Sequence, residues 1–216
     1  MHRRRSSTPP RDDGSHAGQQ RRRIAVEAAR LMSEQGLRDF HAAKRKAAER
    51  LGITEEGALP SNTEIEASLA AYQRLFAADT HGATLQAQRR AALHAMRTLQ
   101  AFSPRLVGPV LTGTATVHND VQLHVFVDNP EAVAISLLDR GVSHDVGEHR
   151  MRLNAERFQI FPSVRFELDR HTIQATVFPV DGIRHTPVSP VDGRPMRRAD
   201  VAELEALVSA GEGVLT

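Results

Sequence analysis

A glycine-containing polar turn between two apolar segments is the part of this 216-residue chain where chemistry is easiest to place. It lies within residues 107–129, VGPVLTGTATVHNDVQLHVFVDN, and Asp120 opens the second segment. From Val121 onward, apolar and polar residues alternate, which predicts a β-strand with one buried face. The side chains of Asp120 and Gln122 are then on the same face of that strand. A carboxylate at the entrance of a strand, beside a polar loop, is a typical position for binding phosphate or a metal ion.

The segment resembles the signature of the nucleotidyltransferase (DNA polymerase β-like) superfamily. In that signature an apolar residue precedes GSxxxG, and a short variable stretch leads to SDhDh, where h is apolar. Gly108 and Gly113 match the two glycines, and residues 119–121, Asn-Asp-Val, match Ser-Asp-apolar. Pro109 stands where the family has Ser, and Gln122 stands where it has the second Asp.

The resemblance implies a nucleotide site and a metal centre. In the family, the glycines let the backbone approach a nucleoside triphosphate, and three carboxylates hold two Mg²⁺ ions that promote nucleotidyl transfer. The resemblance places the catalytic positions at Asp120, Gln122 and Gln174, with Asp120 as the metal ligand. It places the nucleotide-binding turn at Gly108, Thr112, Gly113 and Thr114.

Two of the three positions where the family has metal-binding carboxylates are therefore amides in this chain. The site has one negative charge where the family has three. A neutral amide oxygen is a weak Mg²⁺ ligand, and Pro109 removes one backbone N–H donor from the phosphate turn. We expect a nucleotidyltransferase-fold protein with weakened or lost transfer that binds a nucleotide or nucleic acid. Three alternatives stay open: an active Mg²⁺-dependent nucleotidyltransferase, a nucleic-acid or protein binding module that uses the basic N-terminal helices, and another α+β protein in which the resemblance is accidental and the role is structural or one of interaction.

The periodicity of the chain predicts an α+β fold, in which an N-terminal helical region is followed by a mixed β-sheet flanked by helices. Helices are expected over 19–36, 39–52, 62–76, 84–102, 129–141 and 199–210, with a loop over 78–83. Ile65, Leu69, Tyr72, Leu75 and Phe76 are expected on one side of the third helix. Strands are expected over 106–111, 121–127, 144–153, 157–168 and 172–179. The predicted divisions are a disordered basic tail (1–18), a helical region (19–102) and a nucleotidyltransferase-like region (103–216).

The N-terminal part is basic. Residues 1–50 carry 13 Lys or Arg and 6 Asp or Glu, a net charge of +7 in a chain of net charge +2. Lys44, Arg45 and Lys46 are candidate nucleic-acid contacts on the second helix. The alternative is an ordinary solvated helix face. Arg194, Arg197 and Arg198 form a second basic segment that flanks the last helix.

The composition excludes several classes of site. The absence of Cys excludes disulfides, thiolate metal sites and a Cys nucleophile. No apolar run approaches the roughly 18–20 residues of a membrane helix. The Arg-rich N-terminus lacks the apolar segment of a signal peptide. A cytoplasmic protein with no membrane partner is therefore expected.

Overall fold

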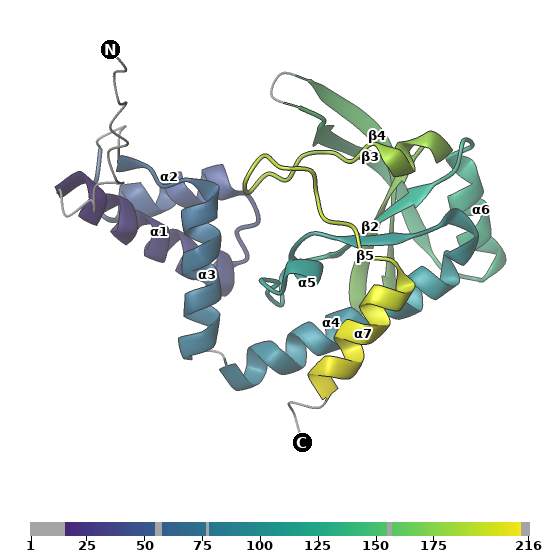
Figure 1. Ribbon diagram of the computed structural model, residues 1–216, viewed down its shortest axis with the longest axis horizontal. Coiled ribbons are helices and arrows are strands. Elements are labelled where there is room, and N and C mark those ends of the chain that lie inside the picture. Colours follow the sequence, from purple (N-terminus) through teal and green to yellow (C-terminus); the bar gives the residue numbers. More distant parts are fainter. Residues whose placement is uncertain (1–15, 55–57, 77, 155–156, 213–216) are drawn as a thin grey trace, which may run out of the picture.

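The chain folds into a group of helices followed by a mixed sheet with further helices (Figure 1). The computed structural model describes residues 16–54, 58–76, 78–154 and 157–212. Its helical part begins with α1 (His16–Gln35), α2 (Phe40–Arg50) and α3 (Asn62–Phe76). Residues 16–18, predicted to belong to the tail, are in α1, and the rest of the predicted tail lies outside the described residues.

The first three helices have an apolar core of their own. Each carries apolar residues three or four positions apart, and these meet between the helices. The buried residues include Ile24, Leu31, Ala43, Ala47 and Ile65. Asp39 caps α2 by accepting a hydrogen bond from the backbone N–H of Ala42 at 2.6 Å, as the sequence predicts.

The end of α3 differs from the prediction. Leu75 and Phe76 were expected on the same side as Ile65 and Leu69, but their exposed fractions are 75% and 74%. α3 is buried through Ile65, Leu69 and Gln73, so its last turn extends past the helices that cover it. The predicted side is therefore wrong for its last two apolar residues.

A long helix, α4 (Ala78–Thr98), continues the chain to the sheet and is followed by η2 (Gln100–Phe102). The loop predicted over 78–83 is wrong, because these residues form the first turns of α4. A glycine such as Gly82 costs a helix only about 1 kcal/mol relative to Ala, which the packing of a long apolar face offsets. That face, which includes Ala92, Ala95 and Met96, packs in the core of the sheet.

Five strands form one mixed sheet in the order β1-β2-β5-β4-β3. They are β1 (Arg105–Val107), β2 (Val121–Phe126), β3 (His144–Arg152), β4 (Phe158–Leu168) and β5 (His171–Phe178). β2 and β5 are parallel, and the other neighbours are antiparallel. The α+β class and the strand segments predicted over 121–127, 144–153, 157–168 and 172–179 are confirmed. The strand expected over 106–111 is wrong from residue 109 onward, because β1 ends at Val107 and Pro109–Thr112 form a short helix. A nucleotidyltransferase-like arrangement stays a prediction. The remaining elements are α5 (Pro109–Thr112), α6 (Glu131–Asp139), η3 (Val180–Arg184) and α7 (Val201–Glu212).

The two faces of the sheet differ in chemistry. One face is apolar and is covered by α4, α6 and α7; its residues from the two central strands are Val121, Leu123, Val125, Ile173, Ala175 and Val177. The other face, called the polar face below, carries the alternate residues. On the central strands these are Gln122, His124, Gln174 and Thr176, with the aromatic pair Phe126 and Phe178 at the carboxyl ends.

The segment between η3 and α7 is fastened to the polar face by Arg198. Its Nε donates to Nδ1 of His124 at 3.0 Å, and its Nη1 donates to the carbonyl oxygens of Gly182 and Ile183 at 3.0 and 3.1 Å. Its guanidinium carbon also lies 4.9 Å from the centre of the Phe126 ring. Burial lowers the pKa of Arg198 to about 10, and the charge is retained at neutral pH. Arg198, which the sequence grouped with charges flanking a helix, is thus a structural residue.

We expect Arg198→Ala to lower the free energy of unfolding by about 2 kcal/mol or more, because three carbonyl or imidazole acceptors lose a charged donor. Urea denaturation followed by circular dichroism measures the change. Arg194→Ala is the matched control, since the Arg194 side chain is 85% exposed, and it should change stability by less than about 0.5 kcal/mol. Equal effects of the two substitutions would contradict the assigned role.

Candidate functional site

The turn after β1 requires its two glycines. Gly108 and Gly113 have φ angles of +72° and +90°, which L side chains rarely adopt. A Cβ atom at Gly108 would also lie 2.5 Å from Oε1 of Gln122. The backbone at Gly108 therefore passes directly against the Gln122 side chain. α5 begins at Pro109, whose missing N–H is no loss at the first position of a helix.

The rest of the turn is held by buried glutamines of two helices. Gln73 of α3 donates to the carbonyl oxygen of Thr114 at 3.0 Å. Gln88 of α4 donates to the carbonyl oxygen of Thr116 at 2.9 Å. Asn119 accepts from the backbone N–H of Thr116 at 2.8 Å and closes the turn. These contacts fix the residues that lead into Asp120, and sequence reasoning missed both glutamines.

Asp120 is the central charged residue of the polar face. Its side chain is only 8% exposed, and Oδ2 contacts two guanidinium groups. Nη1 of Arg38 lies 2.8 Å away, and Nη2 of Arg165 lies 3.1 Å away. Arg38 comes from the connection between α1 and α2, and Arg165 comes from β4. Both arginine side chains are about half exposed, at 49% and 52%.

The two predicted glutamine positions meet beside this cluster. Gln122 and Gln174 are register partners on β2 and β5, and Gln174 is in turn the partner of Arg165 on β4. The structure therefore brings Gln122 and Gln174 together on neighbouring strands, two positions after Asp120. The sequence pattern did not indicate Arg38 or Arg165, because neither lies in a recognisable motif.

The other carboxylates close to the strands in sequence are used elsewhere or lie apart. Asp169 is 2.9 Å from Nδ1 of His94, and Asp128 accepts from the backbone N–H of Val180. Glu167 is exposed and is the register partner of Thr172. It is on β4, and β5 lies between β4 and β2, the strand that Asp120 precedes. Within residues 16–54, 58–76, 78–154 and 157–212, no three His, Asp or Glu side chains are grouped as metal ligands would be.

The threonines of the turn face a carboxyl group from the helical part. The hydroxyl groups of Thr112 and Thr114 are 3.2 Å apart, and Thr114 donates to Glu66 of α3 at 3.3 Å. Burial raises the pKa of Glu66, the Thr114 hydrogen bond lowers it, and the negative charge of Asp192 raises it further. The predicted nucleotide-binding turn thus lies against α3, in contact with a carboxyl group that loses its proton less readily than usual.

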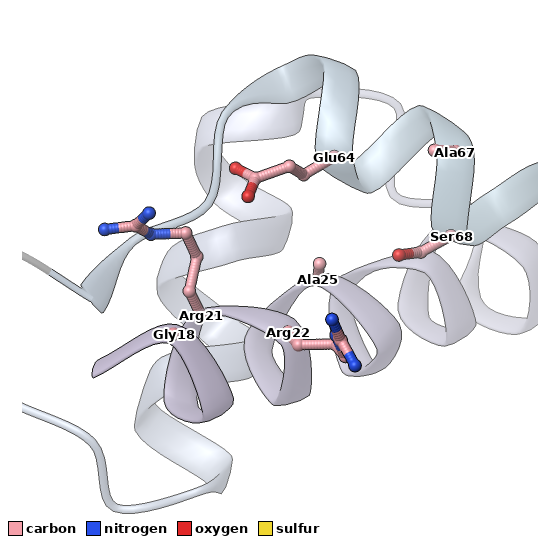
Figure 2. A pocket seen from close by; sticks show the side chains of 7 residues that line it. All are labelled: Gly18, Arg21, Arg22, Ala25, Glu64, Ala67 and Ser68. Carbon is pink, nitrogen blue, oxygen red and sulfur yellow. The ribbon is translucent and has the colours of Figure 1, made fainter. Parts of the chain in front are cut away.

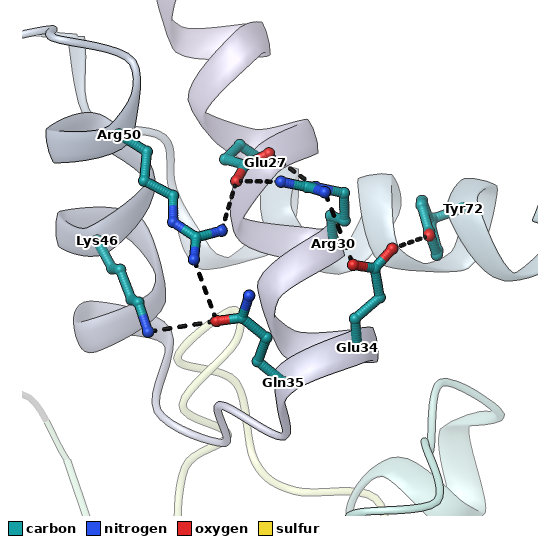
Figure 3. A network of polar contacts seen from close by, with 7 residues as sticks. All are labelled: Glu27, Arg30, Glu34, Gln35, Lys46, Arg50 and Tyr72. Atoms are coloured by element: carbon teal, nitrogen blue, oxygen red, sulfur yellow. Dashed lines mark hydrogen bonds and ion pairs between the residues drawn. The ribbon is translucent and has the colours of Figure 1, made fainter.

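The predicted nucleic-acid contacts on α2 have different environments. Lys44 donates to the carbonyl oxygen of Pro60 at 2.7 Å, and burial lowers its pKa. Lys46 donates to Gln35 of α1, within a polar network that also includes Arg50 and Glu27 (Figure 3). Arg45 is exposed. Lys44 and Lys46 therefore contribute to the packing of the helices.

A second basic feature lies between α1 and α3. A cavity of about 300 Å³ is lined by residues that include Arg21, Arg22, Glu64 and Ser68 (Figure 2). Glu64 also accepts hydrogen bonds from the backbone N–H and hydroxyl of Ser61, which caps α3. Because two guanidinium groups and one carboxylate line this cavity, its net charge is positive.

Comparison with protein-family models, with curated proteins and with solved structures found no match for this chain. Among the helices of the described residues, none combines the length and the apolar character needed to cross a membrane. Any function must therefore be inferred from the geometry and the charge of the polar face.

His124 is a buried titratable group on the same face, with an exposed fraction of 1%. Burial, the positive charge of Arg198 and the neighbouring His149 together lower its pKa to about 3, and burial has the largest effect. Its Nδ1 accepts a hydrogen bond from Arg198, which requires the neutral ring.

This lowered pKa predicts a pH dependence of stability. The unfolded chain binds a proton at this position below about pH 6.5, whereas the folded chain does so only near pH 3. The free energy of unfolding should therefore fall as the pH falls through this range, by roughly 2 kcal/mol at pH 5. His124→Gln keeps an acceptor for Arg198 and removes this contribution. Urea denaturation of both proteins from pH 7 to pH 4.5 measures the difference in slope, and equal slopes would contradict a neutral, buried His124.

Proposed function

We propose that this chain is a nucleotidyltransferase-like protein that binds the phosphates of a nucleotide at the polar face, with weakened or lost nucleotidyl transfer. The observation that carries the proposal is the charge around Asp120. One carboxylate lies between two guanidinium groups, and the adjacent positions 122 and 174 are neutral amides. The cluster has a net charge of +1, which favours an anion.

The same donor set does not fit a pair of Mg²⁺ ions. Magnesium ions bind carboxylate oxygens and water in octahedral geometry, and two of them beside a triphosphate need several negative charges. Here the single carboxylate oxygen Oδ2 already accepts from Arg38 and Arg165. A cation at this oxygen would have to displace one guanidinium and would be repelled by the other. No metal-dependent step is therefore derived for this site.

The arginines have donors left for a ligand. Each guanidinium has five N–H donors, and about half of each side chain is exposed. Arginine suits phosphate because two parallel N–H groups match two phosphate oxygens. The turn that contains Gly108 and Gly113 lies against Gln122, and buried Gln73 and Gln88 hold it in place.

The proposal is tested by titrating the full chain with ATP in EDTA, using calorimetry. We expect binding without a divalent ion, and Arg38→Gln combined with Arg165→Gln should weaken it at least tenfold, because each substitution removes charged donors. Arg74→Gln, on the exposed side of α3, is the matched control and should leave the affinity unchanged.

Asp120→Asn separates the anion site from a metal site. It removes the carboxylate that competes with phosphate for the two guanidinium groups, so ATP binding in EDTA should be kept or become tighter. The active-enzyme alternative makes the opposite prediction. ATP binding that needs Mg²⁺ and is lost in Asp120→Asn, or Mg²⁺-dependent incorporation of labelled nucleotide that is lost in Asp120→Ala, would overturn the proposal.

Nucleic-acid binding by the helical part is a second candidate, favoured by the basic cavity between α1 and α3 and by exposed Arg45. Arg22→Ala and Arg45→Ala should each weaken binding of single- or double-stranded nucleic acid. Each should also make the slope of the logarithm of the binding constant against the logarithm of the salt concentration shallower by about one unit. Fluorescence anisotropy at several salt concentrations measures both. Lys44→Ala is unsuitable as a probe, since Lys44 holds the Pro60 carbonyl. An unchanged slope in both Arg variants would contradict this candidate.

A further inference from the structure

A second cavity lies at the other end of the polar face. It has a volume of about 550 Å³ and is lined by Leu153, Arg157, Arg184, His185, Thr186 and Pro195. Leu153 packs against the aromatic cluster of Phe126, Phe161 and Phe178, at the carboxyl ends of β2 and β5. Asp120 precedes the opposite end of β2, and six residues of strand separate the two ends by roughly 20 Å. The cavity is therefore distinct from the site around Asp120.

The described residues that line the cavity carry positive charge and no carboxylate. Arg157 precedes β4, whereas Arg184 ends η3, so two segments distant in the sequence bring guanidinium groups to one cavity. No acidic residue is among its lining residues, and no ion pair joins Arg157 or Arg184 to a carboxylate in the part of the chain that the structure describes. Like charges that face one cavity repel each other, and an anion bound between them removes that cost.

The walls of the cavity are fixed by hydrogen bonds. The backbone N–H of Leu153 donates to the carbonyl oxygen of Arg157 at 2.8 Å, and the N–H of Arg157 donates to Oδ1 of Asn154 at 2.9 Å. On the opposite wall, half-buried Arg198 donates to the carbonyl oxygens of Gly182, Ile183 and His185. The backbones that carry Arg157 and Arg184 are thus held before any ligand binds, which lowers the entropy cost of binding.

We propose that this cavity binds a small phosphorylated molecule with an apolar part. Its phosphate contacts Arg157 and Arg184, and His185 supplies a further polar group. Leu153 and Pro195 contact the apolar part. The volume is in the range of small-molecule sites, and a mostly apolar lining with a few convergent polar groups is typical of them. This site is additional to the nucleotide site proposed above and does not rest on it.

The proposal is tested by two-dimensional NMR of the ¹⁵N-labelled full chain during separate titrations with inorganic phosphate and with AMP. Both should shift the amide signals of Arg184, His185 and Thr186, and AMP should bind at least several-fold more tightly because only it has a part that contacts Leu153 and Pro195. Arg157→Gln combined with Arg184→Gln should weaken binding of both at least tenfold. The combined Arg38→Gln and Arg165→Gln variant should leave these particular shifts unchanged, which separates this site from the one at Asp120.

Arg140→Gln, at the exposed end of α6, is the matched control and should bind as the unchanged chain does. The circular dichroism spectrum verifies the fold of each variant, since both mutated side chains of the cavity are exposed and their backbone hydrogen bonds are kept. The proposal is overturned if neither ligand shifts these signals at about 10–20 mM, a range far above typical ligand affinities, or if the shifts persist in the Arg157 and Arg184 double variant. Equal affinity for AMP and phosphate would overturn the assignment of an apolar part.

Discussion

The pairing of Asp120 with two arginines is the interaction on which the polar face depends. A carboxylate that is 8% exposed is stable only where opposite charges or hydrogen-bond donors replace the lost water. Arg38 supplies one of these donors from the helical part, and Arg165 supplies the other from β4. The contact therefore joins the connection between α1 and α2 to the sheet, and it also decides which ions the site favours. Without the arginines, the position would suit a cation; with them, it suits an anion.

A second constraint is the position of the turn that leads to Asp120. The carbonyl groups of Thr114 and Thr116 are held by Gln73 and Gln88, both buried, from two different helices. A buried amide is costly unless it forms hydrogen bonds, so these residues specify one arrangement of the helices against the turn. Further contacts between α3 and the segment before α7, such as that from Asn62 to the carbonyl oxygen of Pro190, act in the same direction. The helical part and the sheet thus form the walls of one site.

The sequence predicted much of this fold because local patterns determined it. Alternation identified β2 and the hairpin of β4 and β5, and glycines with positive φ marked the turn around α5. What failed depended on packing between distant segments. Nothing local distinguishes Leu75 from Leu69, since only the extent of the neighbouring helices exposes one and buries the other. Likewise, Arg38 and Arg165 are 127 positions apart, and only the fold brings both to Asp120.

The architecture also explains why two candidate anion sites occur on one face. The helices α4, α6 and α7 cover the apolar face, so the alternate residues of the same strands are left to form the opposite face. Toward the carboxyl ends of β2 and β5, this face is covered by aromatic rings and by Arg198, which holds the segment before α7 against it. The segment leaves an open region at each end, and each contains two arginines from different segments. Because, among the described residues, a carboxylate accompanies the pair only at Asp120, the two regions differ in net charge, and we expect them to differ in the anions that they prefer.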